Sequence, residues 1–251
     1  MQIHCESGTP DGLQKIATIN RLERDGRLER YFAGVKLRSL TLGEQAAARW
    51  NSTHFDDLAK LHHNYIREHR VHGFQLARLL REIPEAPTVI SQAATVVVIG
   101  PGFGSEISLI TPLTDAAIFA VEINPAAHPA LAFERPWLEI FTAIEDLPEL
   151  GTEVTFVANY VLAQPTLDND FSMSKFAESL LFAAPTGFTM LSTLPFSSSY
   201  HNRSKFADEK LPADEILVAH LREYGADVKF EMRVGPGPYF ARLSTIEVGP
   251  R

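Results

Sequence analysis

The stretch Thr95-Val-Val-Val-Ile-Gly-Pro-Gly-Phe-Gly-Ser-Glu106 decides the fold. Its first part is β-branched and apolar without alternating polar positions, which predicts a strand buried on both faces of a parallel sheet. Three glycines follow at positions 100, 102 and 104. Glycine adopts turn dihedrals that other residues avoid and lets a ligand approach the backbone closely. The stretch therefore predicts a ligand-binding loop at the carboxyl end of a central strand, where open parallel sheets bind their ligands.

Similar short apolar runs recur after this stretch and are separated by segments of helical character. They cover residues 117–121, 138–142, 154–158 and 188–192. Two further runs, 228–234 and 239–248, are linked only by Gly-Pro-Gly-Pro, which is too short for a crossover helix, so they must form an antiparallel hairpin. Between them and the fifth run, a helix is expected to begin at Pro212 and to end at Gly225. The sequence thus predicts an α/β fold with a seven-stranded, mostly parallel, doubly wound sheet that ends in an antiparallel hairpin.

The N-terminal third has a helical pattern, with apolar positions repeating every three to four residues, so that they lie on one helix face. The first such stripe is Phe55, Leu58, His62, Tyr65, Ile66 and His69, and the second is Phe74, Ala77, Leu80 and Ile83. Pro84 and Pro87 are expected to break the second helix. We therefore expect a helical N-terminal cap or substrate region over residues 1–88 and a Rossmann-like ligand-binding domain over residues 89–251.

Composition excludes several classes of protein. The net charge of −8 argues against a surface that follows nucleic-acid phosphates. Cys5 is the only cysteine, so no disulfide can form within one chain. No apolar run of about 18 residues, the length of a membrane span, is present. We expect a cytoplasmic protein with a small-molecule substrate and no nucleic-acid or membrane partner. A homodimer is a possible assembly.

An acidic residue supports the glycine loop. Glu122 ends the second predicted strand, where an acid can accept hydrogen bonds from both hydroxyls of a ribose. The dinucleotide fingerprint would need a third glycine at position 105, which is serine, and no Gly-Lys-Ser/Thr follows as a P-loop requires. The loop and the acid together predict a site for an adenosine-containing cofactor. The alternatives are a ligand-free strand-to-helix turn and an ordinary solvated glutamate.

In their order along the chain these motifs resemble class I S-adenosylmethionine-dependent methyltransferases, over about residues 90 to 250. The motifs are Val98–Gly104, Ala120–Asn124, Glu145–Pro148, Val157–Leu162 and the closing hairpin. The resemblance implies S-adenosylmethionine (SAM) as the cofactor. The implied cofactor-binding residues are Gly100, Pro101, Gly102 and Gly104 in the loop, Glu122 and Ile123 after the second strand, Ile144 and Glu145 near the adenine, and Asn159 and Tyr160 near the sulfonium methyl.

The sequence departs from the family pattern at two positions. Many relatives carry an acid two residues before the first glycine, where this chain has Val98. Many also carry an aspartate at the position of Ala143. Contacts to the methionyl amine and to the adenine must then come from other groups. A protein that binds the cofactor without turning it over therefore stays an alternative.

The resemblance implies methyl transfer from SAM to an oxygen or nitrogen of a small molecule. A general base is needed only where the acceptor must lose a proton. The candidates for this role or for acceptor contacts are Tyr65, His69, Tyr160 and His201. No metal is expected, because the histidine spacing gives no set of four ligands. An aminocarboxypropyl transferase similar to nicotianamine synthase is the second enzymatic interpretation.

Overall fold

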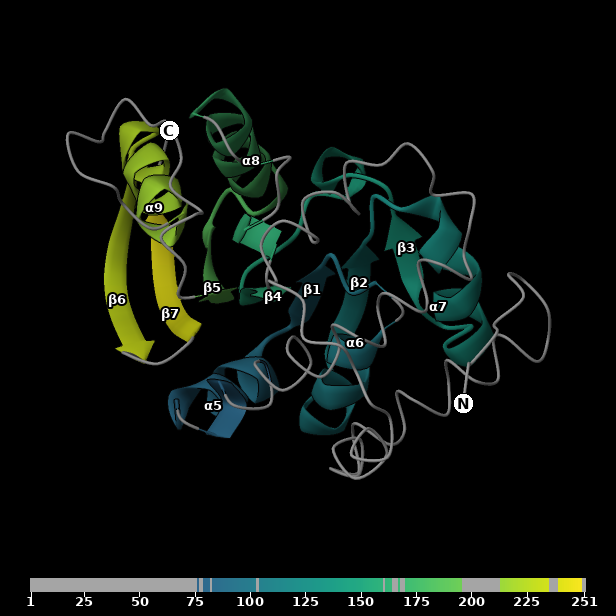
Figure 1. The fold of residues 1–251 in the computed structure, drawn as a ribbon. Coiled ribbons are helices and arrows are strands. Elements are labelled where there is room, and N and C mark those ends of the chain that lie inside the picture. Colours follow the sequence, from purple (N-terminus) through teal and green to yellow (C-terminus); the bar gives the residue numbers. More distant parts are fainter. Residues whose placement is uncertain are drawn as a thin grey trace, which may run out of the picture.

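The computed structural model describes residues 76, 79–81, 83–102, 104–159, 161–163, 167, 170–195, 213–234 and 239–249. In this part of the chain a single sheet carries helices on both faces (Figure 1). No helix among the described residues is long and apolar enough to cross a membrane.

The sheet has seven strands in the order β3-β2-β1-β4-β5-β7-β6. The strands are β1 (Thr95–Ile99), β2 (Ala117–Val121), β3 (Glu139–Phe141), β4 (Val154–Asn159), β5 (Gly187–Pro195), β6 (Ala226–Val234) and β7 (Tyr239–Val248). Strands β1 to β5 run parallel, and β7 pairs antiparallel with both β5 and β6. The predicted fold class and its closing hairpin are confirmed.

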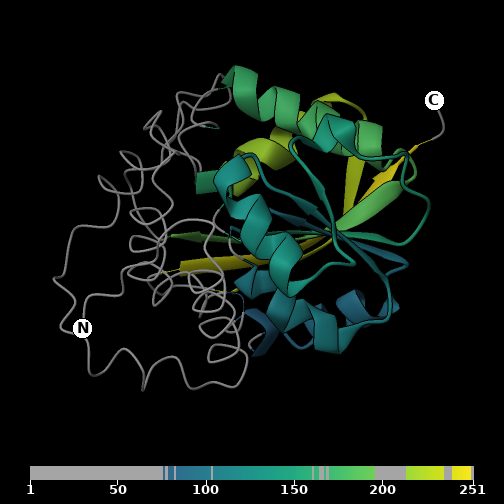
Figure 2. The same cartoon turned by 90° about the vertical axis from the view of Figure 1, so that its right-hand side faces the viewer.

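Two groups of helices cover the sheet. The first group is α5 (Glu85–Gln92), α6 (Ser105–Ile110) and α7 (His128–Glu134), and the second is α8 (Asp170–Ala183) and α9 (Ala213–Glu223). Four short 3-10 turns occur along the described part of the chain between these helices and the strands: η1 (Thr111–Leu113), η2 (Pro125–Ala127), η3 (Ile144–Asp146) and η4 (Val161–Ala163). Turned by 90°, the ribbon shows helices on either side of the sheet (Figure 2).

The alternation of side chains along β1 explains why both faces are apolar. Val96 and Val98 pack in the cluster that contains residues of α5, α6 and α7. Val97 and Ile99 pack in the opposite cluster with residues of α8 and α9. Because successive side chains of a strand point to opposite faces, a strand covered on both sides has to be apolar throughout.

The helix break expected at Pro84 and Pro87 is present at the first of these prolines, because residues 79–81 are helical and Ile83 and Pro84 are not. Helix α5 begins directly after Pro84, and Pro87 lies in its first turn. Proline is tolerated there because the first N–H groups of a helix have no intrahelical partner. Residue 88, where the sequence predicts a domain boundary, lies within α5, and the division into two domains stays a prediction. The buried side chains of Leu76, Leu79 and Ile83 belong to the same apolar cluster as β1.

Candidate functional site

The glycine loop follows β1 at the edge of the sheet where the parallel strands end. Gly100, Gly102 and Gly104 have φ values of 64°, 54° and 92°, which side chains with a Cβ rarely adopt. A Cβ on Gly100 would lie 2.9 Å from Cγ2 of Val161, and one on Gly104 would lie 2.7 Å from Nη1 of Arg135. Backbone conformation therefore favours glycine at all three positions, and close packing also requires it at Gly100 and Gly104.

Glu122 is joined directly to this loop. The backbone N–H of Gly102 donates to Oε2 of Glu122 at 2.8 Å, and the N–H of Asn124 donates to Oε1 at 2.8 Å. The Glu122 residue is 1% exposed. The two features that the sequence assigned to one site are therefore hydrogen-bonded to each other at the ends of β1 and β2.

Burial changes the acid–base behaviour of this carboxyl group. Removal from water raises the pKa of Glu122 from 4.5 to about 7, because burial disfavours the charged form. The N–H groups of Asn124 and Gly102 oppose the rise, and the nearby Glu106 carboxylate adds to it. Near neutral pH both protonation states are populated, and the protonated form can also donate a hydrogen bond.

A second buried polar group lies at the ends of β4 and β5. Asn159 donates from Nδ2 to Oε1 of Glu106 at 2.7 Å and accepts a hydrogen bond from Oγ1 of Thr193 at Oδ1. All three residues are buried. The sequence indicated Asn159 but not its partners. Glu106 could have been noticed in the sequence, because it follows the last loop glycine by two residues. The pairing of Thr193 with Asn159 could not, because it depends on the register of β5 with β4.

Arg135 is a further residue that the sequence analysis missed. It is 5% exposed and lies beside Gly104, where its Nη2 donates to Oγ of Ser108 on α6. Its Nη1 lies 3.0 Å from Oε2 of Glu134. The guanidinium thus links the end of α7 to α6, the helix that follows the glycine loop, and it packs beside Gly104 of the loop.

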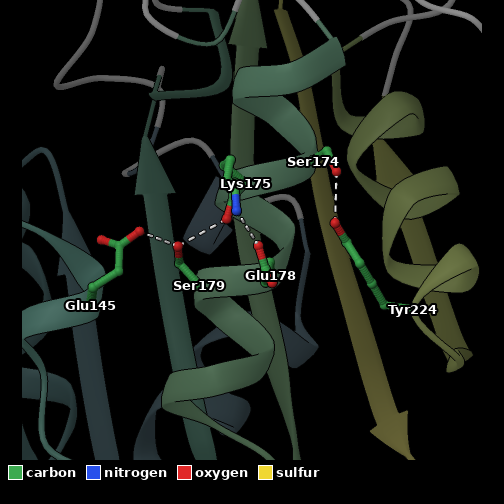
Figure 3. A network of polar contacts seen from close by, with 6 residues as sticks. All are labelled: Glu145, Ser174, Lys175, Glu178, Ser179 and Tyr224. Atoms are coloured by element: carbon green, nitrogen blue, oxygen red, sulfur yellow. Dashed lines mark hydrogen bonds and ion pairs between the residues drawn. The ribbon is translucent and has the colours of Figure 1, made fainter.

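Ile123 and the two residues expected near the adenine, Ile144 and Glu145, lie in different environments. Ile123 is 56% exposed, while Ile144 is buried in the cluster with α8. The exposed Glu145 accepts a hydrogen bond from Oγ of Ser179 on α8 (Figure 3). Asp146 closes the turn after β3 by accepting the N–H of Ala143 at 3.1 Å. The structure therefore brings Glu122 and the loop together but turns Glu145 toward α8.

The four candidate catalytic residues, Tyr65, His69, Tyr160 and His201, lie outside the described residues, as does Phe103. The expected N-terminal cap also lies outside them, apart from its last few positions. These assignments stay predictions from the sequence. Among the described residues, no group of three or more His, Cys, Asp or Glu side chains is arranged to hold a metal ion.

The strand order, the antiparallel β7, the glycine loop after β1 and the acid after β2 together define the fold of class I SAM-dependent methyltransferases. No protein-family model matches the sequence, and no curated protein matches it.

Solved structures do match the fold. A 1,6-didemethyltoxoflavin-N1-methyltransferase from Burkholderia thailandensis, with its substrate and S-adenosylhomocysteine bound, is 13% identical with a TM-score of 0.52, covering 84% of this chain and 92% of that chain. A SAM-dependent methyltransferase from Leishmania major is 15% identical with a TM-score of 0.51, covering 81% and 82%. Magnesium protoporphyrin IX methyltransferase from Synechocystis, with S-adenosylhomocysteine bound, is 9% identical with a TM-score of 0.50, covering 93% and 99%.

Proposed function

We propose that this protein transfers a methyl group from SAM to an oxygen or nitrogen of a small-molecule acceptor. The observation that carries the proposal is the hydrogen bond from the Gly102 N–H to Glu122, which joins a glycine loop to an acid at the ends of adjacent strands. The proposal is supported by the fold, which is that of methyltransferases whose structures contain S-adenosylhomocysteine.

The residues at the sheet edge fit this cofactor. Each oxygen of Glu122 accepts one backbone N–H and, when ionised, has a further lone pair for a ribose hydroxyl. Glycine in the loop allows a ligand to approach the backbone closely. In the proposal, Glu106 supplies the negative charge for the methionyl ammonium, since Val98 occupies the position where relatives carry an acid. Asn159 orients this carboxylate through its Nδ2.

The cofactor would supply a methyl group already activated by a positive sulfur, so the protein has to align the acceptor and exclude water. The buried Asn159 is the described residue that we assign to the region of the methyl group. A proton needs to be removed only from an alcohol, phenol or ammonium acceptor. Tyr65, His69, Tyr160 and His201 are the proposed sources of the base and of acceptor contacts.

Calorimetric titration with SAM and S-adenosylhomocysteine tests the cofactor site. Gly102→Val should abolish binding in a folded protein, because the new side chain occupies the ligand's space. Glu122→Ala should weaken binding by about 1.5 to 3 kcal/mol, the usual contribution of a hydrogen bond to a charged group. Glu139→Ala, which removes an exposed glutamate on β3, is the matched control and should leave binding unchanged. Equal affinity in folded Gly102→Val would contradict the assignment of the loop.

A comparison of two ligands tests the separate roles of the acids. Glu106→Gln should weaken binding of S-adenosylhomocysteine but not of 5′-methylthioadenosine, which has the ribose and adenine without the ammonium group. Glu122→Ala should weaken binding of both ligands. If Glu106→Gln affects both ligands equally, its carboxylate does not bind the ammonium.

The identity of the products distinguishes methyl transfer from aminocarboxypropyl transfer. Incubation with SAM and a metabolite extract, followed by mass spectrometry, should yield S-adenosylhomocysteine and a methylated acceptor. Transfer of the aminocarboxypropyl group would instead leave 5′-methylthioadenosine. Binding without any turnover would identify a non-catalytic SAM-binding module.

A further inference from the structure

Helix α8 covers one face of the sheet (Figure 1), and four of its exposed residues form an apolar and charged stripe. Phe171 and Phe182 are 74% and 69% exposed, which are the highest values among the large apolar side chains that the structure describes. Lys175 and Glu178 lie between them, with 60% and 53% of their side chains exposed. At about 100° per residue the four positions fall within about 60° around the helix axis. We call these four residues the α8 stripe.

The order of residues in the α8 stripe is symmetric. The spacing is four, three and four residues, which is the spacing of the seam between two paired helices. The midpoint between Phe171 and Phe182 is also the midpoint between Lys175 and Glu178. When an identical helix is laid antiparallel on this midpoint, each phenylalanine faces a phenylalanine and each lysine faces a glutamate.

We propose that the α8 stripe is a homodimer interface, in which two copies of the chain pair α8 antiparallel about a twofold axis. A twofold interface must be complementary to itself, and this stripe meets that condition in spacing, apolar character and charge. Phe171 then packs on Phe182 of the partner subunit, and Lys175 pairs with Glu178 of the partner subunit. Within one chain Nζ of Lys175 lies 2.9 Å from Oε2 of Glu178 (Figure 3), so in the dimer the four charges alternate in sign.

The charged centre and the apolar ends have different roles. The phenylalanine rings supply the apolar area that leaves water, up to about 200 Å² for each ring. The charges fix the register, because a slip along the helix would place like charges or a charge and a ring opposite each other. A contact based on one helix is small compared with the roughly 1,600 Å² of a standard interface, so the dimer should dissociate in the micromolar range.

The charge pattern also separates this partner from other candidates. An anionic lipid surface would select a run of basic residues. The α8 stripe instead carries one lysine and one glutamate, and the whole chain has a net charge of −8. A second copy of the chain satisfies both charges at once.

Sedimentation velocity of the full chain from about 1 to about 300 μM, a range that brackets a micromolar dissociation constant, should show a monomer–dimer equilibrium. The double variant Phe171→Ser with Phe182→Ser should weaken dimerisation at least tenfold. Phe133→Ser removes a phenylalanine that is 47% exposed on α7 and is the matched control, with unchanged dimerisation expected. A wild-type protein that stays monomeric over the whole range would overturn the proposal, as would a dimer that both variants leave intact.

Charge exchange distinguishes an interface from a local effect on the helix. Lys175→Glu and Glu178→Lys should each weaken the dimer, because each variant places like charges opposite each other twice. A mixture of these two variants should form a heterodimer, since every facing pair is then of opposite sign. Circular dichroism of each variant checks that it is folded. A mixture that associates no better than the separate variants would show that the two residues do not meet across an interface.

Discussion

The buried carboxyl group of Glu122 has a measurable consequence for stability. Glu122→Gln removes the titrating group while keeping the size of the side chain. The variant also turns an NH₂ group toward one of the two backbone N–H groups that the carboxylate accepts. This mismatch costs about 1 to 3 kcal/mol, but it does not depend on pH. The informative quantity is therefore the change with pH of the difference in unfolding free energy between wild type and variant.

The sign and size follow from the pKa of Glu122, which burial raises from 4.5 to about 7. Between these values the folded protein binds more protons at Glu122 than the unfolded chain, so stability falls as the pH rises. Below 4.5 both states are protonated and the penalty is absent, whereas above 7 it is complete. At about 1.4 kcal/mol per pH unit, the wild type should lose about 3 kcal/mol relative to the variant across this window.

Urea unfolding of both proteins at half-unit steps from pH 4 to 8.5 measures this difference, because the other titrating groups cancel. The expected curve is flat below pH 4.5, falls to about pH 7 and is flat again above it. A difference that stays constant over the whole range would mean that the Glu122 carboxyl is solvated. A difference that grows with pH would mean that the two backbone N–H groups outweigh burial and lower the pKa of this group.

Three further predictions concern other parts of the site. In thermal unfolding, Gly104→Ala should lower the free energy of unfolding by about 1 to 3 kcal/mol more than Gly225→Ala does. Both glycines have φ near +90°, but only a Cβ at Gly104 would meet packed atoms. Equal losses would show that the clash is relieved. Asn159→Leu should cost about 1 to 3 kcal/mol in urea unfolding, since it leaves a buried acid and a buried hydroxyl without a shared partner; an unchanged midpoint would refute this. Tyr65→Ala and His69→Ala should lower kcat/KM for the acceptor tenfold or more, about 1.4 kcal/mol, with cofactor affinity unchanged in calorimetry. Equal turnover would place this helix face away from the chemistry.

Much of the sheet could be predicted because its strands are short apolar or β-branched runs, and β1 and β4 are buried on both faces. The runs 117–121 and 239–248 coincide with β2 and β7, and the predicted 154–158 differs from β4 by one residue. In such strands the apolar run and the strand have the same ends, since polar or turn residues begin where the cover ends. The hairpin followed from the shortness of the link between its strands.

Features that depend on a distant partner could not be predicted. Strand β5 spans Gly187–Pro195, longer than the predicted 188–192, because it pairs with β7 along its whole length. The insertion of β7 between β5 and β6 has no local signal either. The same holds for Arg135, whose role depends on the contact between α7 and Gly104. Local patterns specify elements, whereas tertiary pairing specifies their extent and neighbours.

The departure at Val98 has a physical explanation in this fold. Val98 is 0% exposed and packs in the apolar cluster with Ile107 and Leu131, so an acid there would be buried among apolar side chains. Burial raises the pKa of a carboxyl group, as it does at Glu122, and a neutral acid binds an ammonium poorly. Glu106 instead starts from α6, the helix after the loop, and its Oε1 accepts a hydrogen bond from Nδ2 of Asn159. A negative charge at this end of the sheet is therefore compatible with an apolar β1, provided that it comes from α6.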